Sequence, residues 1–452
     1  MNNIFNTNKI YKTSHQNEFY YSLVVLINFL LILLPDLNSY ITLLNSILFV
    51  KIYLSGKNVE YQVGLTIYLL FIFYTSSLFS FNSGIIYGAS DELTTYLNHR
   101  MSNKIESTFF NFGSVFNIES YLYKSLLVLN NNTKVTSALD LSFELKKLSS
   151  LFGILTYIEI DNNIKLCNFK KLKNIKKWLI ILFPFVIYYS IIGVRDIILA
   201  YLILAAYNNL IKFLQIKKII YILKLLLLLT LSYLVRPEHA VLFALLFSFL
   251  IFNNKYKRCS ILLLVLAISV FFIYILPKVT YILRIYSSYN DRMLSSTNSL
   301  ANKLRLLPFP INIIVTFLYS LLCIFPASYA LKSKFLVEGN VDGIIQVSSV
   351  FDFSIAKILK FLGFVFYHIY IINYSLSVFK YRDLDSYEKK SLFLFVSLVF
   401  SLSFFGVDSG HFLIGIPIIL PHLVKRLKAN YILAISLFIY FLLNFIYILI
   451  KY

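Results

Sequence analysis

Long, continuous apolar runs, separated by short basic clusters, are the feature that most constrains how this chain can fold. Residues 219–235 and 431–450 are two such runs, with a single lysine in the first and no charged residue in the second. A bilayer core of about 30 Å is crossed by roughly 17–25 mostly apolar residues, and only helices and closed barrels satisfy the backbone hydrogen bonds there. Because the runs do not alternate between apolar and polar residues, they predict helices. We therefore expect an all-α polytopic integral membrane protein with about 12–14 transmembrane helices.

The composition agrees with this class. Of the 452 residues, 59% are hydrophobic and 14% are charged, whereas a soluble domain has about 25% charged residues. The net charge of +21 would suggest a nucleic-acid partner in a soluble chain. Here the basic residues lie in short clusters between apolar runs, as in membrane proteins oriented by their cations, so we expect no nucleic-acid partner.

The predicted spans lie in a single membrane domain, residues 1–452. The first span follows a polar N-terminus without a small-residue cleavage site, so it is interpreted as retained and not as a signal peptide. The spans are residues 19–34, 40–54, 61–81, 136–158, 178–194, 197–211, 219–235, 239–252, 259–276, 356–377, 391–407, 411–424 and 431–450.

The distribution of cations predicts the orientation of the chain. Residues 161–177, 212–218, 255–258 and 425–428 together hold fifteen cations and one acid, and such segments are normally cytoplasmic. The connections between them are then extracytoplasmic. They include two large loops, residues 83–135 and 277–355, and long loops in compact proteins are usually functional.

Two segments do not fit this scheme simply. Residues 136–158 carry two acids and two lysines, so they form either a span with a polar side facing the protein or an interfacial helix. The parity of the crossings favours a span. Residues 311–325 are apolar but short and are bounded by prolines, so we expect a re-entrant or interfacial segment.

Several kinds of chemistry lack support in the sequence. Cys167, Cys259 and Cys323 are isolated, so neither a disulfide framework nor a zinc site is indicated. Nucleotide-binding, metalloprotease and serine-hydrolase motifs do not occur in a usable context. We therefore expect no cofactor and no metal.

The second large loop is basic on the side where cations are normally depleted. Residues 277–310 carry Arg284, Arg292, Arg305 and two lysines against one acid, Asp291. An anionic ligand on the outer side explains this, because arginine contacts phosphate oxygens in a bidentate manner. The alternative is a solvated or headgroup-facing segment without a specific ligand.

A second candidate cluster lies at two tight turns predicted at the same outer level. Arg195 precedes Asp196 at one turn, and Arg236, Glu238 and His239 mark the next. Together they offer cations for anion binding and groups for proton transfer. The alternative is a set of structural ion pairs at the membrane interface.

Two further positions carry candidate proton-transfer groups. Asp91 and Glu92 follow a glycine-containing segment after the third span, where they either accept a proton from a sugar hydroxyl or cap the following helix. His411 begins a late span that contains Pro417. It either donates to an oxyanion or is an ordinary interfacial residue.

Taken together, these features resemble the Wzy-type polymerases of O-antigen and capsular polysaccharide. The local carriers are residues 88–92, Arg195-Asp196, Arg236-Pro237-Glu238, residues 307–310 and residues 411–417. Relatives often have arginine at the start of the late proline-containing span, where this chain has His411.

The resemblance implies a fold similar to the helical, lipid-donor (GT-C-like) glycosyltransferases. It implies an enzyme of the bacterial cytoplasmic (inner) membrane, with its active site facing the periplasm or exterior. Its partners would be undecaprenyl-diphosphate-linked oligosaccharide, membrane lipid and a chain-length regulator protein. A growing glycan is moved from its lipid diphosphate onto a single lipid-linked repeat unit. The arginines would bind the diphosphate, and Asp91, Glu92 and Glu238 are the candidate bases, in that order.

Two alternatives remain open from the sequence. A flippase for the same lipid-linked sugar needs cations along a central cavity but has little use for two long outer loops. A ligase or another lipid-donor glycosyltransferase shares the requirement for cations at the diphosphate.

Overall fold

The computed structural model describes part of the chain. The described residues are 85–86, 138–167, 176, 179–180, 182–191, 195–235, 237–252, 261, 264–265, 268, 307–308, 310–322, 332–337, 346–351, 355–381, 384–403, 414–427 and 431–451.

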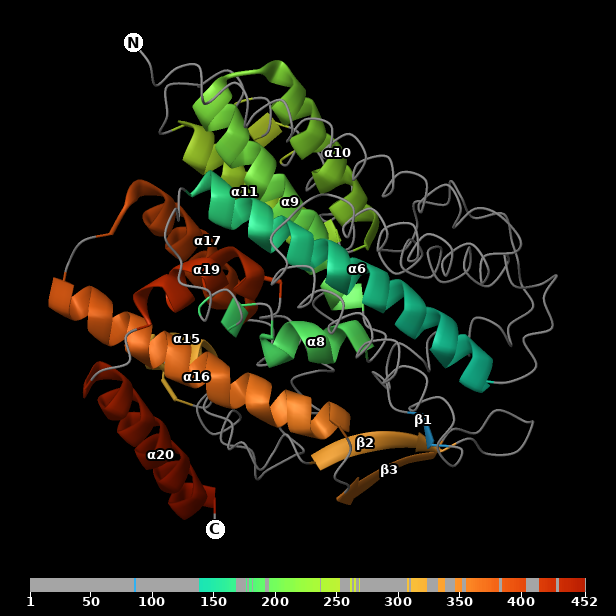
Figure 1. The fold of residues 1–452 in the computed structure, drawn as a ribbon, viewed down its shortest axis with the longest axis vertical. Coiled ribbons are helices and arrows are strands. Elements are labelled where there is room, and N and C mark those ends of the chain that lie inside the picture. Colours follow the sequence, from blue (N-terminus) through green and yellow to red (C-terminus); the bar gives the residue numbers. More distant parts are fainter. Residues whose placement is uncertain are drawn as a thin grey trace.

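These residues form a predominantly helical structure (Figure 1), as the apolar runs predict. The helices are α6 (Ala138–Leu166), α8 (Pro184–Ile191), α9 (Arg195–Ile216), α10 (Ile219–Val235), α11 (Pro237–Phe252), α15 (Ile311–Leu322), α16 (Ile355–Tyr381), α17 (Ser386–Ser403), α19 (Ile416–Arg426) and α20 (Tyr431–Lys451). Several match predicted spans to within a few residues, and α10 matches its span at both ends. The predicted span at 178–194 is described only in part, and the short helix α8 lies within it.

Three consecutive helices, α9, α10 and α11, are joined by very short turns. Lys217 and Lys218 connect α9 to α10, and Lys217 has a left-handed backbone with φ of 64°. Few L-residues adopt this conformation, and it ends the helix and reverses the chain. A single residue, Arg236, separates α10 from α11. Since both turns reverse the chain, α9 and α11 begin at the same end of this unit.

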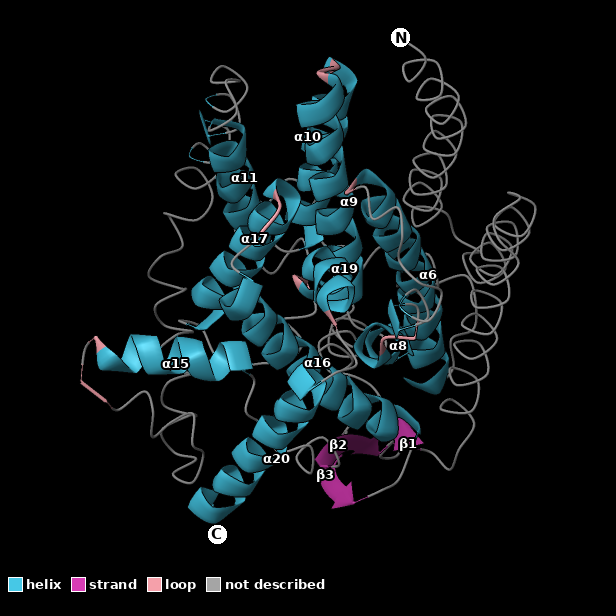
Figure 2. Cartoon of the chain, turned by 60° about the vertical axis from the view of Figure 1, so that its left-hand side comes forward, coloured by secondary structure: helices cyan, strands magenta, loops and turns pink. Residues whose placement is uncertain are grey.

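Helix α9 is the centre of the described bundle, with α6 and α10 packed along it (Figure 2). Its side chains from Ile197 to Ala206 are all buried. A polar contact joins it to α6, where Asn163 Nδ2 donates to Asn208 Oδ1 at 2.8 Å and Asn208 Nδ2 donates to Glu159 Oε2 at 2.7 Å. Glu159 and Asn163, in the C-terminal part of α6, therefore face α9.

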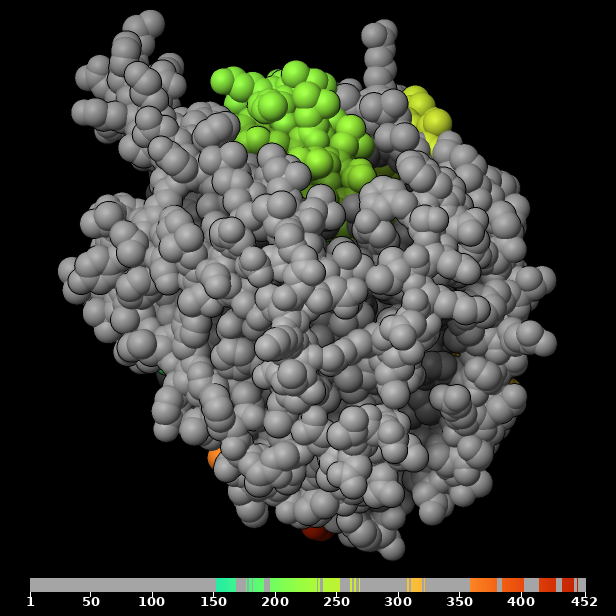
Figure 3. All heavy atoms as spheres, turned by 90° about the vertical axis from the view of Figure 1, so that its right-hand side faces the viewer, coloured from blue at the N-terminus to red at the C-terminus, as the bar shows by residue number. Residues whose placement is uncertain are grey.

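Other helices leave apolar side chains exposed. Ile219, Leu223 and Leu227 form a stripe along α10, and Phe438, Phe441 and Phe445 form another along α20. In the space-filling view, the green atoms of the α9–α10 hairpin reach the surface (Figure 3). Apolar faces of this kind mark contact with a membrane or a partner.

A small antiparallel sheet was not part of the all-α expectation. It consists of β1 (Ile85–Ile86), β2 (Lys332–Val337) and β3 (Gln346–Phe351), in the order β1-β2-β3. Ile85 pairs with Val337, and Lys332 pairs with Phe351. β1 comes from the first predicted outer loop, and β2 and β3 come from the second. The sheet therefore joins the two loops beside the start of α16 (Figure 1).

Two described helices are long and apolar enough to cross a membrane. They cover Asp196–Ile216 in α9 and Ile358–Phe379 in α16. Helix α15 is shorter, and Figure 2 shows it lying across the direction of the bundle. Its Ile311, Ile314 and Leu318 are exposed, which is the arrangement expected of an interfacial segment.

Gly363 on α16 provides a test of this packing. A Cβ at Gly363 would lie 2.6 Å from Cδ1 and 2.8 Å from Cγ of Phe185, whose ring is buried. We expect Gly363→Val to destabilise the protein by about 1–3 kcal/mol through overpacking, measured as a lower Tm in detergent. The matched control is Ser375→Val at an exposed position of the same helix. Equal Tm values for the two variants would contradict the close α8–α16 contact.

Candidate functional site

Most of the predicted site residues lie outside the described residues. These are Asp91, Glu92, Arg236, Arg284, Arg292, Arg305 and His411. Their roles therefore stay predictions.

The structure places the remaining candidates at two helix starts. Arg195 and Asp196 begin α9, and Glu238 and His239 lie in the first turn of α11. The side chains of Asp196 and His239 are buried. Asp196 occupies the first turn of α9, where a carboxylate is favoured by the helix dipole.

An aromatic contact between α9 and α11 shows where the two helices start relative to each other along the bundle. The rings of Tyr207 in α9 and Phe247 in α11 stack with centroids 6.5 Å apart. At a rise of 1.5 Å per residue, Arg195 lies about 18 Å before Tyr207, and Pro237 lies about 15 Å before Phe247. The two helices therefore start at similar levels, at the same end of the unit.

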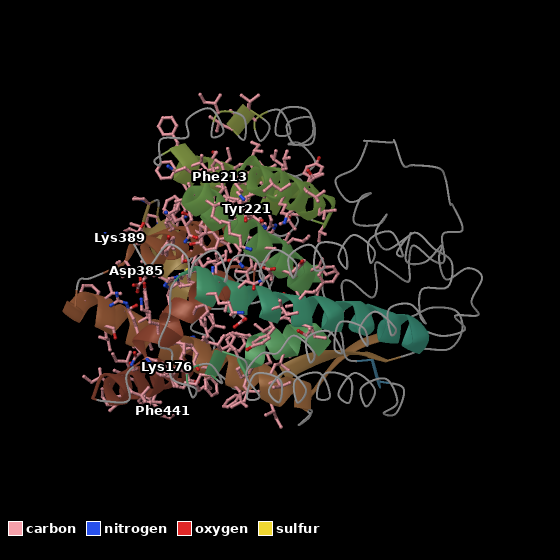
Figure 4. The ribbon with its side chains drawn as sticks, turned by 45° about the horizontal axis from the view of Figure 1, so that its top comes forward. Lys176, Phe213, Tyr221, Asp385, Lys389 and Phe441 are labelled. Carbon is pink, nitrogen blue, oxygen red and sulfur yellow. The ribbon has the colours of Figure 1, made fainter. Side chains whose placement is uncertain are left out.

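A different cluster is the most highly organised polar site in the described part of the chain. We define the ion-pair cluster as Asp385, Glu388, His422, Lys425 and Arg426. The first two residues lie at the start of α17, and the last three lie at the end of α19. Figure 4 shows Asp385 and Lys389 together on one side of the molecule.

Local sequence explains how α17 begins there. The carboxylate Oδ1 of Asp385 accepts a hydrogen bond from the backbone N–H of Glu388 at 2.8 Å. The backbone N–H of Lys389 donates to the carbonyl of Asp385 at 3.0 Å. Asp385 is therefore the N-cap of α17. Its negative charge and that of Glu388 also suit the start of a helix, as Lys425 and Arg426 suit the end of α19.

Two ion pairs join these helix ends. Arg426 contacts Glu388 with Nε on Oε1 and with Nη2 on Oε2, the latter at 2.8 Å. The Glu388 side chain is only 1% exposed, and that of Arg426 is 15% exposed. Lys425 Nζ lies 2.9 Å from Asp385 Oδ2, and both side chains are about 40% exposed. The first pair is therefore buried and bidentate, whereas the second is a surface pair.

Neutral groups extend the cluster into the bundle. His422 Nε2 lies 3.0 Å from Ser391 Oγ, which lies 2.8 Å from Tyr207 OH. All three residues are buried. The guanidinium carbon of Arg426 lies 6.0 Å from the centre of the Tyr374 ring. The cluster thus connects α9, α16, α17 and α19.

The electrostatics of Asp385 favour its charged form. Burial raises the pKa of its carboxyl group, but hydrogen bonds from Lys425 and from the Glu388 backbone hold the pKa below its ordinary value. Asp385 therefore remains a carboxylate under physiological conditions and keeps both partners.

The ion-pair cluster contains the residue types of a metal site, but its carboxylates already have cationic partners. Ligand atoms of Asp385, Glu388 and His422 lie within 4.8 Å of one another. Both carboxylates already accept hydrogen bonds from cationic side chains, Lys425 and Arg426. A divalent ion would have to displace both cations, so we assign the cluster to holding the helices together.

Three of the four cation-rich segments meet at this end of the bundle. Lys176 Nζ donates to the carbonyl of Lys425 at 2.7 Å. Gln215 Nε2 donates to the carbonyl of Leu166 at 3.2 Å and to Tyr387 OH at 2.7 Å. We call this the basic end.

Sequence reasoning did not identify the ion-pair cluster. The sequence presents Lys425 and Arg426 as markers of orientation, and it gives Asp385 and Glu388 no evident partner. The available signal was the Asp-x-x-Glu pattern of Asp385 and Glu388 before an apolar run, which is typical of a helix start. The pairing itself joins residues 38 positions apart, and no local pattern predicts it.

No protein-family model, curated protein or solved structure matches this chain.

The two ion pairs predict different costs of truncation. We expect Arg426→Ala to destabilise the protein by about 3–5 kcal/mol, because it leaves the buried Glu388 carboxylate without its partner. Lys425→Ala, at the exposed pair, should cost no more than about 1 kcal/mol. Thermal unfolding in detergent measures both. Adding Glu388→Gln to Arg426→Ala should restore part of the lost stability, since it removes the uncompensated charge. Equal losses for the two alanine variants would be inconsistent with a buried pair.

Proposed function

We propose that this chain is a polytopic membrane glycosyltransferase that polymerises lipid-linked oligosaccharide repeat units. The observation that carries the proposal is the sheet that joins the two predicted outer loops. β3 ends at Phe351, four residues before α16 begins, and the far end of α16 leads to Asp385. The 27 residues of α16 span about 40 Å. The sheet and the basic end are thus separated by more than the thickness of a bilayer core.

The exposed apolar stripes of α10 and α20 support the membrane part of the proposal. Phe438 and Phe441 are each 66% exposed, and no charged residue occurs in α20 before Lys451. Such faces are stable against lipid chains and would be costly in water. Figure 4 shows Phe441 at the periphery of the molecule.

The proposed reaction needs fixed cations and a base. The acceptor hydroxyl oxygen attacks the anomeric carbon of the donor glycan, and the bond from that carbon to the lipid diphosphate breaks. Arg284, Arg292 and Arg305, with Arg195 and Arg236, are proposed to stabilise the charge on the departing diphosphate. The hydroxyl proton is taken by Asp91, Glu92 or Glu238. His239 is proposed to contact the substrates, and His411 to donate to the oxyanion or exchange a proton.

The sheet bears on the choice between polymerase and flippase. A polymerase must hold two lipid-linked glycans at the outer face, and two long loops tied together by a sheet suit that task. A flippase needs a pathway across the membrane and gains little from such a structure. A ligase or another lipid-donor glycosyltransferase is the second candidate, because it would use the same outer arginines.

Deletion of the gene in the source bacterium tests the function. For a polymerase, we expect surface polysaccharide to be reduced to single repeat units on its anchor, seen on gels of extracted glycan. A flippase deletion would instead leave lipid-linked units on the inner side, and a ligase deletion would leave polymerised glycan on the lipid carrier. Complementation with Arg195→Ala, Arg236→Ala, Arg284→Ala or Arg292→Ala should lower polymerisation, by roughly 100-fold for an arginine that contacts the diphosphate.

Two controls accompany this experiment. Lys218→Ala, at an exposed lysine of the α9–α10 turn, should complement fully. Full-length chains from all four arginine variants would reject the proposed anion site while leaving the deletion result intact. Normal polymerisation by the double variant Asp91→Asn, Glu92→Gln would exclude these two residues as the base.

Cysteine labelling in intact cells tests the orientation. A membrane-impermeant maleimide should label Ser349→Cys in β3, and should label Lys217→Cys at the α9–α10 turn only after the cells are permeabilised. The background is the chain with Cys167, Cys259 and Cys323 replaced by serine. Labelling of both positions in intact cells, or of Lys217→Cys alone, would rule out the proposed topology.

A further inference from the structure

One face of α16 carries three polar side chains in the interior of the bundle. Tyr370, Asn373 and Ser377 are 2%, 0% and 1% exposed. At 3.6 residues per turn, these three positions fall within an arc of about 60°. They therefore form one buried polar stripe along α16, which we call the α16 stripe.

The polar atoms of the α16 stripe have no hydrogen-bond partner among the residues that the structure describes. This holds for Tyr370 OH, for Ser377 Oγ and for both Nδ2 and Oδ1 of Asn373. Buried polar groups in folded proteins are nearly always hydrogen-bonded to protein or to ordered water. An asparagine with neither its donor nor its acceptor engaged is therefore an observation that requires an explanation.

Three other hydroxyl groups in the bundle behave differently from that of Ser377. Thr156, Ser190 and Ser232 each donate to the carbonyl four residues earlier in their own helix, at 2.5–2.8 Å. This bond is the usual solution for a hydroxyl inside a helix. Ser377 does not make it, so its hydroxyl has no partner among the described residues.

The stripe faces the interior of the bundle and not α20. The Tyr370 ring stacks on Phe183, with centroids 5.9 Å apart. On the opposite side of α16, the ring of His368 lies 5.5 Å from that of Tyr440 in α20. Tyr374, adjacent to Asn373, contacts Arg426. The stripe therefore begins beside the ion-pair cluster and extends away from it into the bundle.

The donors and acceptors of the α16 stripe determine what kind of ligand it can bind. A carboxamide and two hydroxyls offer both donors and acceptors and carry no net charge. A cation would lack a carboxylate of its own there and would be repelled by Arg426, which is already paired with Glu388. A small neutral species that both donates and accepts hydrogen bonds satisfies all four atoms.

We propose that the α16 stripe binds internal water molecules. Ser377 and Tyr370 lie seven positions apart, or about 10 Å along the helix. Its neighbour toward the basic end is the ion-pair cluster, whose Asp385 and Lys425 are in contact with solvent. Water at the stripe thus lies inside the bundle, next to the basic end. This inference does not depend on the proposed polymerase activity.

Radiolytic hydroxyl-radical footprinting of the full-length protein in detergent tests the inference. Radicals form from water, so a buried aromatic ring is oxidised rapidly only where a bound water lies beside it. The matched control is Tyr367, on the same helix and 1% exposed, whose hydroxyl donates to the carbonyl of Leu321 at 2.9 Å. We expect Tyr370 to be oxidised at least several-fold faster than Tyr367. Equal protection of the two tyrosines would overturn the proposal.

The substitution Asn373→Leu gives an independent test, because the two possibilities predict changes in Tm of opposite sign. If water satisfies the stripe, Asn373→Leu removes those hydrogen bonds, slows oxidation of Tyr370 and lowers Tm by at least about 2 °C. If the amide is instead unsatisfied, Asn373→Leu relieves a buried polar group and raises Tm, which would overturn the proposal. If Asn373→Leu fails to fold, the oxidation rates of Tyr370 and Tyr367 still test the proposal. They are measured in the wild-type protein and in Ser377→Ala, which is a smaller change.

Discussion

The buried pair between Arg426 and Glu388 is the interaction on which the basic end of the bundle depends. Neither charge is tolerated alone in an apolar interior, so each fixes the position of the other. The pair joins the end of α19 to the start of α17, and Asp385 holds that start in a helical conformation. Helix α19 is buried along nearly its whole length, and Gly415 just before it packs against Phe395 and Leu398 of α17. Because α19 has almost no exposed side, its position follows from these contacts.

Helix α16 relates the basic end to the opposite side of the molecule. Near its start it accepts the Phe185 ring over Gly363, and near its end it contacts Arg426 through Tyr374. The sheet of the two predicted outer loops lies just before it in the chain. The two ends of the molecule are thus held together by different interactions. Paired charges fix the basic end, whereas the opposite side carries backbone pairing between segments about 250 residues apart.

The sequence predicted the helices well because hydrophobicity decides them. Helix α10 has the predicted bounds, since the polar pair Lys217-Lys218 and the Arg236-Pro237 step end the apolar run on both sides. The sheet was missed, because strands such as Lys332–Val337 are short and lie within long loops without a strict alternation. Lys425 and Arg426 are predicted to be orientation signals, which stays a prediction, whereas the structure shows them in ion pairs. Of the candidate site, Arg195, Asp196, Glu238 and His239 could be placed at two helix starts on the same side, because short turns fix such geometry.

The two kinds of buried polar group in this bundle follow one physical rule. An ionised side chain must find an opposite charge, because its transfer from water costs far more than that of a neutral group. Glu388 accordingly has a bidentate partner, whereas Asn373 has none among the described residues. A neutral amide or hydroxyl needs only a hydrogen bond, which a single water molecule supplies. The paired charge of Glu388 on α17 therefore constrains its neighbours more strongly than the neutral groups of Tyr370 and Asn373 on α16 constrain theirs.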